Sequence, residues 1–339
     1  MADSMFWGIA WAFVLVLAGT VPSVAAATKP CRTSSKFRVG FYKYTCPAAE
    51  SIVKQTLYEA IAKNPGMAAG LLRLHFHDGF VRGCDASVLL KSTPENPAER
   101  DHPTNNPSLR GFEIIDQAKA RLEAVCPKTV SCADIVAFAA RDSVYKTGGI
   151  YYNVPAGRRD GRVSRLSEVT QNLPSPNFNA QQLIANFARK GLSANEMVTL
   201  LGAHSIGISH CSSFSSRLYA FNATLTQDPS LDPAFAAFLK TKCLPQSNVT
   251  RVDPTVPLDS ITPGTLDNKY YLQLLKLRGV LATDETLYTS PSTSRMVVSN
   301  AVNGAAWRAK FAKAMVKMGS LDVLTSAQGE IRELCSVVN

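Results

Sequence analysis

Two of the chain's five histidines stand in the segment Leu71-Leu-Arg-Leu-His-Phe-His-Asp78. On a helix, Arg73 and His77 lie four positions apart and share one face. An imidazole base beside a fixed cation suits a reaction that removes a proton and then stabilises negative charge on a nearby oxygen. The same residues also fit a histidine pair satisfied inside a core, with Arg73 in a salt bridge. The segment alone leaves both interpretations open.

His75-Phe-His77 offers a second interpretation, because a His-x-His pair can bind zinc in a metallohydrolase. Gly79 and Phe80 follow, where such a site would need a further acidic residue or histidine. A metallohydrolase therefore stays a distant alternative, and measuring the metal content of the protein would test it.

Two stretches are rich in the oxygen ligands that Ca²⁺ prefers. The range 78–87 offers two carboxylates, one hydroxyl group and several carbonyls, and the range 259–267 offers two carboxylates, hydroxyl groups and carbonyls. Neither range has the spacing of an EF-hand. Ordinary turns capped by Asp and Thr are the alternative for each.

Helical periodicity dominates the chain and predicts a mainly α-helical protein. Helices are expected near 50–63, 67–78, 112–125, 132–146, 183–187, 232–242, 268–278 and 307–318. Ile150 to Val154 is the best strand signal. Long loops are expected at 91–110, 155–179 and 244–266, and loops of that length usually carry function or hold ions.

One helix start is well specified. Ser193-Ala-Asn-Glu196 is a capping box, and Leu192 and Met197 are placed as a hydrophobic staple. The helix that follows runs to His204, which is therefore expected near its C-terminal end.

The N-terminus predicts export. Met5 to Gly19 is an unbroken apolar run, too short for a membrane span, and small residues at Val24 to Ala27 follow Pro22. We expect a signal peptide at 1–27 and one domain at 28–339; a buried N-terminal helix is the alternative. In an oxidising compartment the eight cysteines beyond this segment suit four disulfides, but spacing leaves their pairing open.

The composition fits a globular secreted protein. Hydrophobic residues make up 46% and charged residues 18%, which excludes a disordered chain. Asn222 and Asn248 begin glycosylation sequons. The net charge of +10 is spread out, which argues against nucleic acid and favours polyanions outside the cell.

Seven motifs in this order resemble the secreted plant (class III) haem peroxidases. They are LLRLHFHDGFVRGCDASVLL, SCADIVAFAARDSV, VPAGRRDG, NLPSP, LLGAHSIGISHC, LDSITPGTLDNKYY and GEIRELCSVVN. The resemblance runs from about Val39 to Asn339. It implies a mainly α haem-peroxidase fold of about ten helices, with distal and proximal halves sandwiching one haem b. Long loops binding two Ca²⁺ and few short strands complete that expectation.

The resemblance assigns roles on the distal side. His77 would be the base that moves a proton on H₂O₂, with its tautomer fixed by Asn105. Arg73 would stabilise charge on the O–O bond. Phe76 would shield the haem edge, and Pro174 would lie beside the aromatic donor.

On the proximal side, His204 would be the axial haem ligand, and Asp284 would accept its other N–H and strengthen its electron donation. The calcium ligands also follow from the resemblance. The first ion would use Asp78, Val81, Gly83, Asp85 and Ser87, with Glu99 linked through water, and the second would use Ser205, Asp259, Thr262, Thr265 and Asp267.

One departure from the family concerns its cysteines. The usual distal motif reads His-Asp-Cys, whereas Gly79 follows Asp78 here; Cys84 has lost that partner and Cys31 is gained upstream. The resemblance implies the pairs Cys46–Cys126, Cys132–Cys335 and Cys211–Cys243, and our hypothesis adds Cys31–Cys84. A six-residue loop and a loop of roughly fifty residues are worth about 2 and about 4 kcal/mol, so the exchange need not cost stability.

The resemblance therefore implies a secreted, glycosylated, monomeric enzyme that catalyses H₂O₂ + 2 AH₂ → 2 H₂O + 2 AH• with phenolic donors. The short tail after Cys335 favours the cell wall or apoplast, where acidic polysaccharide would attract it. Phenolic oxidation of the lignin type, peroxide removal and a response to oxidative stress are the expected roles. An inactive scaffold of the same fold is the alternative, although a scaffold would need none of the catalytic residues.

Overall fold

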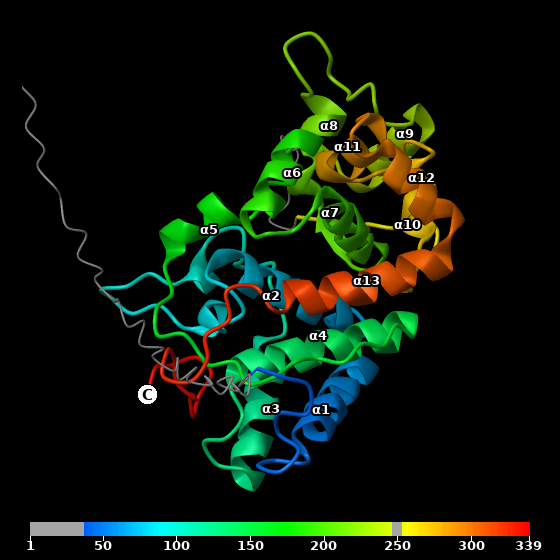
Figure 1. Ribbon diagram of the computed structural model, residues 1–339. Coiled ribbons are helices and arrows are strands. Elements are labelled where there is room, and N and C mark those ends of the chain that lie inside the picture. The colour runs from blue at the N-terminus through cyan, green and yellow to red at the C-terminus, as the bar shows by residue number, and fades with distance from the viewer. Residues whose placement is uncertain (1–36, 246–252) are drawn as a thin grey trace, which may run out of the picture. The chain divides into compact units, whose positions relative to one another are not determined.

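Helices form nearly all the regular structure of the residues that the computed structural model describes, 37–245 and 253–339 (Figure 1). The α-helices are α1 (Ala49–Lys63), α2 (Met67–Val81), α3 (Phe112–Val125), α4 (Cys132–Gly148), α5 (Leu166–Asn172), α6 (Ala180–Arg189), α7 (Ala194–Leu201), α8 (Ser215–Tyr219), α9 (Pro233–Lys242), α10 (Lys269–Leu274), α11 (Ala282–Thr289), α12 (Ser294–Val302) and α13 (Gly304–Met318). Short 3-10 turns are η1 (Ser87–Leu89), η2 (Glu99–Asp101), η3 (Gly202–Ser205) and η4 (Cys211–Ser213). The predicted signal peptide, Cys31 and Asn248 lie outside the described residues.

Two short strands pair antiparallel. They are β1 (Ile208–His210) and β2 (Thr255–Pro257), with Ser209 opposite Val256. The prediction of a mainly α-helical protein with few short strands is confirmed.

The predicted strand at Ile150 to Val154 is wrong. Its side chains do alternate, since Ile150, Tyr152 and Val154 are buried while Tyr151 is 57% exposed. No neighbouring strand pairs with this segment among the described residues; the nearest pairing is a single bridge between Ala156 and Arg38. Burial alternates, but without a partner no sheet forms. The predicted loop at 155–179 also contains a helix, α5.

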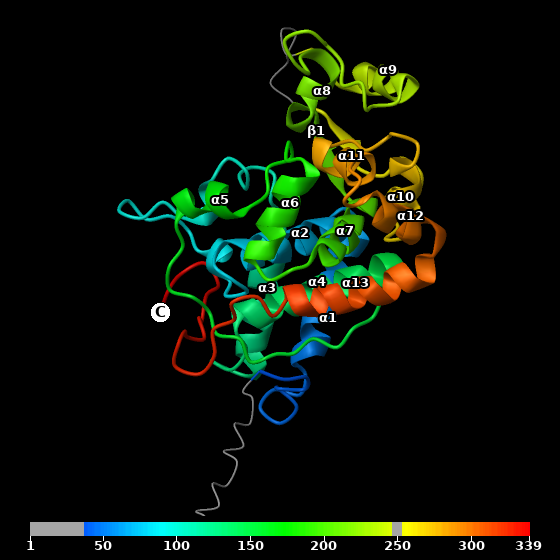
Figure 2. The ribbon, with the colours of Figure 1, turned by 45° about the horizontal axis from the view of Figure 1, so that its top comes forward.

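Helix α2 lies at the centre of one group of helices. It packs on α4, and α4 also contacts α1 and α3. A second group gathers α6, α7 and α10 to α12, and Figures 1 and 2 show α13 running between the two groups. Twelve of the fifteen residues of α2 are buried, so polar groups on this helix are shielded from water.

A continuous core joins these helices, and a smaller one lies around α8, α9 and β2. Within the described residues no helix has the length and apolar character to cross a membrane.

Three disulfides implied by the resemblance are confirmed: Cys46–Cys126, Cys132–Cys335 and Cys211–Cys243. Cys84 is a free thiol here, 0% exposed, and it donates to the Met318 carbonyl at 3.3 Å. The structure therefore contains no disulfide at Cys84. Because Cys31 lies outside the described residues, the Cys31–Cys84 bond stays a prediction. The bond would require the enclosed Cys84 sulfur to become accessible to a second thiol.

Candidate active site

Helix α2 and the segment after η2 position the predicted base. The His77 Nδ1 atom lies 2.7 Å from the Asn105 side-chain oxygen, and the Asn105 amide donates to the Glu99 carbonyl at 2.7 Å. Because that amide must face Glu99, its oxygen faces the imidazole, and the proton of the ring belongs on Nδ1. Nε2 is thereby left as the basic atom. Burial and then the Arg73 charge hold the pKa of His77 well below its usual range, so the ring is neutral at neutral pH.

Arg73 lies one turn away on the same helix, as predicted. Its guanidinium donates to the Ser108 hydroxyl and to the Thr104 carbonyl, each at 3.0 Å. Burial and then Arg110 lower its pKa to about 10, which leaves it cationic at neutral pH. No carboxylate of the described residues forms an ion pair with it, so its charge is not neutralised.

Phe76 and Pro174 are both half-buried. The Phe76 ring packs on Phe80 with centroids 4.4 Å apart and lies 6.4 Å from Phe187. Pro174 comes two residues after α5. These contacts hold Phe76 beside His77, whose ring centroid is 5.6 Å away.

The capping box at Ser193 is confirmed and begins α7. His204 follows in η3, and its Nδ1 lies 2.7 Å from the Oδ1 of Asp284 on α11. That carboxylate is 0% exposed and also accepts from the Tyr270 hydroxyl at 2.8 Å and the Leu281 N–H at 3.1 Å. Burial raises the pKa of Asp284, but the His204 ring and these hydrogen bonds outweigh burial and bring it below its usual value. The ring and the carboxylate therefore form a fixed pair.

Sequence reasoning missed a buried clamp beside this pair. Arg217, 2% exposed, donates to Asp228 at 2.7 Å and to the carbonyls of Gly279 and Val280 at 2.6 and 2.9 Å. The Gly279 N–H donates to Glu285 at 2.7 Å. Both backbone groups of Gly279 are thus held, which fixes the turn leading into α11. None of the quoted motifs contains Arg217, Asp228 or Glu285, and Tyr270 stands in the motif LDSITPGTLDNKYY without a role assigned from the sequence.

The first oxygen-rich stretch gathers buried acids. Asp78 accepts from the Ala86 N–H at 3.1 Å through Oδ2, while its Oδ1, the Ser87 hydroxyl and one Glu99 oxygen are buried with no partner. Burial, then Asp85, raises the pKa of Asp78, and burial raises that of Glu99 to about 8. Orphaned oxygens and buried carboxylates of this kind are what a bound cation would satisfy.

Two further predicted ligands frame this stretch. Gly83 has φ +102°, and a Cβ there would lie 2.6 Å from Asp322, so only glycine fits. The Val81 carbonyl accepts from the Lys190 ammonium at 3.3 Å, a contact that the prediction did not foresee.

The second stretch converges around Thr262. Its hydroxyl lies 3.2 Å from an Asp259 oxygen and 3.1 Å from both Asp267 oxygens. The Ser205 hydroxyl accepts from the Asp267 N–H at 3.2 Å, and the Thr265 N–H donates to Thr262. Burial raises the pKa of Asp259. Ser205 follows His204 directly in η3, so this cluster adjoins the predicted haem ligand.

No three His, Cys, Asp or Glu side chains of the described residues group as a metal site. Both clusters instead combine carboxylates with hydroxyl and carbonyl oxygens, a donor set suited to Ca²⁺ and not to zinc. Asp78, Asp85 and Glu99 interact within the first cluster, and Asp259, Thr262 and Asp267 do so within the second.

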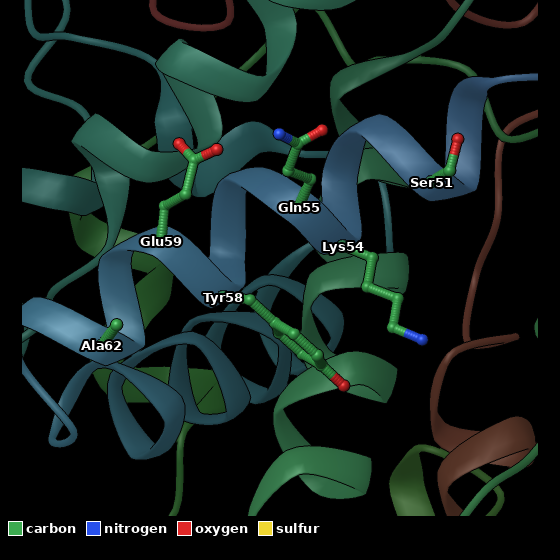
Figure 3. A pocket seen from close by; sticks show the side chains of 6 residues that line it. All are labelled: Ser51, Lys54, Gln55, Tyr58, Glu59 and Ala62. Atoms are coloured by element: carbon green, nitrogen blue, oxygen red, sulfur yellow. The ribbon is translucent and has the colours of Figure 1, made fainter.

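One surface hollow lies away from these residues (Figure 3). It has a volume of about 580 Å³, and all six of its lining residues belong to α1: Ser51, Lys54, Gln55, Tyr58, Glu59 and Ala62. It opens to solvent along one helix and includes none of the predicted catalytic residues. Chemistry and geometry, not the size of a hollow, therefore locate the site.

Comparison with known proteins shows which family the chain belongs to. The family model "Peroxidase" matches residues 53–303. Peroxidase 5 of Vitis vinifera is 57% identical over 305 residues, covering 90% of this chain and 92% of the relative. Peroxidase 1 of Zea mays is 50% identical over 315 residues (91% and 85%), and Peroxidase 57 of Arabidopsis thaliana is 45% identical over 305 residues (90% and 93%).

The chain belongs to the peroxidase family. It is a plant class III peroxidase, an enzyme that reduces H₂O₂, and haem and calcium are the cofactors expected of that family.

Proposed function

We propose that this enzyme is a haem b peroxidase of the cell wall or apoplast that oxidises phenolic donors one electron at a time. One observation carries the proposal. His77 and His204 each engage a side-chain oxygen through Nδ1, and neither Nε2 has a hydrogen-bond partner among the described residues. One free nitrogen suits the metal, and the other suits the oxidant.

The residues present fit a haem. The His204 side chain is 33% exposed although the Asp284 that holds it is fully buried, so its free nitrogen is open to a ligand. A neutral imidazole is the usual proximal ligand of haem iron in peroxidases. When bound, the haem supplies the iron at which peroxide is reduced. Asp284 keeps the proton on Nδ1 of His204 and leaves Nε2 to the metal.

The distal residues would handle the proton and the charge. His77 takes the proton of H₂O₂ on Nε2 and gives it to the departing oxygen, and Asn105 keeps the ring in the tautomer that this requires. Arg73, cationic and without a carboxylate partner, stabilises the negative charge that grows as the O–O bond breaks. The overall reaction is H₂O₂ + 2 AH₂ → 2 H₂O + 2 AH•. Phe76 would limit access to the haem edge, with Pro174 beside the phenol.

Two Ca²⁺ ions would bind the two oxygen clusters. The first would be held by Asp78, Val81, Gly83, Asp85 and Ser87, and the second by Ser205, Asp259, Thr262, Thr265 and Asp267. The orphaned oxygens of the first cluster and the buried Asp259 of the second support this assignment. Each cluster adjoins a functional histidine in sequence, so each ion would brace one half of the site.

The remaining features of the proposal concern the enzyme's surroundings. It includes removal of residues 1–27, a monomer, and attraction of the cationic surface to acidic polysaccharide. Glycosylation at Asn222 is supported by its exposure, and its side chain accepts from the Thr224 N–H at 2.9 Å. Roles in phenolic oxidation of the wall and in oxidative stress would follow.

One experiment tests the core of the proposal. The purified protein is titrated with haemin, its absorption spectrum and metal content are recorded, and H₂O₂ is added in stopped flow. We expect one haem per chain and a rapid spectral change. His77→Ala should keep the haem and slow that change by several orders of magnitude, whereas His204→Ala should weaken haem binding. Folded protein that binds no haemin would refute the proposal, and stoichiometric zinc would favour a metallohydrolase.

A further inference from the structure

One tyrosine stands apart from the other nine. Tyr44 is 83% exposed, against 57% for Tyr151 and 43% for Tyr145, and the remaining seven are buried or half-buried. A phenol this accessible is chemically the same as the small donors of the enzyme. We propose that Tyr44 is itself a donor, and that its oxidation joins two enzyme molecules through a covalent bond between their Tyr44 rings. This inference rests on the proposed oxidation of phenols.

The exposure of Tyr44 is built into a fixed turn. Two residues before it, Tyr42 is 4% exposed and donates to Asp134 at 2.7 Å. Two residues after it, Cys46 is fully buried in its disulfide. The Cys46 N–H donates to the Tyr42 carbonyl at 2.9 Å, which closes the turn. Tyr44 therefore lies at the tip of an anchored turn, and its ring is held out in solvent.

The other exposed tyrosines are poorer candidates because their rings are partly covered. Tyr145 and Tyr151 pack edge to face with centroids 6.1 Å apart. Lys54 lies 5.6 Å from the Tyr145 centroid, and Arg141 lies 5.4 Å from that of Tyr151. Lys43 lies at a similar distance, 5.4 Å, from the centroid of Tyr44, so a nearby cation does not distinguish Tyr44 from the other two tyrosines. Access decides, because coupling requires a carbon ortho to the hydroxyl to meet a second ring.

The chemistry balances with the peroxide that the enzyme already uses. Each Tyr44 hydroxyl loses one proton and one electron, and H₂O₂ takes up two of each as its O–O bond breaks to give two waters. The two phenoxyl radicals join through ortho carbons, and the ring hydrogens displaced there return to the oxygens. The sum is 2 Tyr–OH + H₂O₂ → dityrosine + 2 H₂O. Because Tyr44 is the most exposed tyrosine of the described residues and the rings of Tyr145 and Tyr151 are partly covered, coupling should stop at the dimer.

The test uses the mature holoenzyme with stepwise additions of H₂O₂, first alone and then with guaiacol as a small phenol. Dimer is followed on reducing gels, dityrosine by its fluorescence, and the linked peptide by mass spectrometry. We expect a dimer whose cross-link joins Tyr44 to Tyr44. Tyr44→Phe should lose this dimer while guaiacol oxidation is unchanged. Tyr151→Phe, the matched control, should keep both.

Four results would overturn the inference. Wild-type enzyme that oxidises guaiacol yet stays monomeric would reject it while leaving the proposed function intact. So would a Tyr44→Phe variant that dimerises like the wild type, or cross-links that map to Tyr145 or Tyr151. Absence of guaiacol oxidation would overturn both the proposed function and this inference. This outcome differs from the others because neither guaiacol nor tyrosine is consumed.

Discussion

Replacing Gly79 by cysteine should restore a disulfide that the fold is still shaped to hold. A Cβ built at Gly79 would lie 3.1 Å from the Cys84 sulfur. That is about the distance between a Cβ and the partner sulfur across an ordinary disulfide, given an S–S bond of about 2.05 Å. Both residues are buried, so the new bond would form inside the packed turn that follows Asp78.

The expected gain follows from the short loop that the bond would close. Linking positions 79 and 84 closes a six-residue loop, which the chain-entropy model values at about 2 kcal/mol. Removing a glycine from the interior of α2 adds a few tenths of a kcal/mol. The weak S–H donation from Cys84 to Met318 is lost in exchange. We therefore expect a net stabilisation of about 2 kcal/mol.

Urea unfolding of oxidised and reduced Gly79→Cys enzyme measures this gain. Gly79→Ser is the matched control, because it introduces a side chain of similar size that cannot cross-link. Peptide mapping without reduction should find the introduced cysteine bonded to Cys84. Equal free energies of unfolding for the oxidised cysteine variant and the serine variant would refute the reasoning, as would two titratable thiols at these positions.

Four further predictions concern the site. Tyr270→Phe removes a hydrogen bond to the Asp284 carboxylate and should cost about 1.5–3 kcal/mol at pH 7. The pKa of Asp284 is lower in the folded than in the unfolded protein, so the ionised carboxylate stabilises the folded state at pH values above its pKa in the unfolded protein. As pH falls through the folded-state pKa, this contribution is lost. Urea unfolding at a series of pH values should therefore find that the difference in stability between wild type and Tyr270→Phe shrinks as pH falls. Asn105→Leu removes the hydrogen bond that raises the pKa of His77, so the acid limb of the pH profile for the reaction with H₂O₂ should move to lower pH. The plateau rate should fall by up to about 100-fold, because the tautomer of His77 is no longer fixed. An unchanged plateau rate would contradict the role given to Asn105. Arg217→Met leaves a buried carboxylate uncompensated and should lower the free energy of unfolding by about 3–5 kcal/mol; a wild-type melting temperature would contradict the clamp. Chelating Ca²⁺ from the holoenzyme should lower its melting temperature, since a ligand at 100 times its Kd contributes about 2.7 kcal/mol, and Ca²⁺ but not Mg²⁺ should restore it.

Local signals in the sequence predicted local structure well. The apolar character of α2 and the capping box before α7 depend on neighbours within a few positions, so their spacing could be read directly. The same rule explains the error at Ile150 to Val154. Alternation there reports burial correctly, but a strand also needs a partner, and the partner is a matter of tertiary structure.

The same distinction between local and long-range signals applies to the residues of the candidate site. His77 and His204 stand in motifs specific enough to assign, and resemblance located Asn105 and Asp284. Tyr270 lies within a quoted motif but received no role, and the Arg217 clamp lies outside all of the motifs. Their contacts join residues up to 63 positions apart, as between Arg217 and Val280, and a single tyrosine or arginine has no distinguishing pattern.

Glu99 connects the hydrogen bonds behind His77 with the acidic residues of the first oxygen-rich cluster. Its carbonyl oxygen orients the amide behind His77, while its carboxyl group, one oxygen of which is buried without a partner, lies among the acids of the first cluster. If the proposed Ca²⁺ binds this cluster, its loss would change the positions of Glu99 and Asn105 and, through them, that of His77, while the helices stay folded. Enzyme that loses activity when Ca²⁺ is withdrawn should then regain it when Ca²⁺ is resupplied, because no refolding is needed.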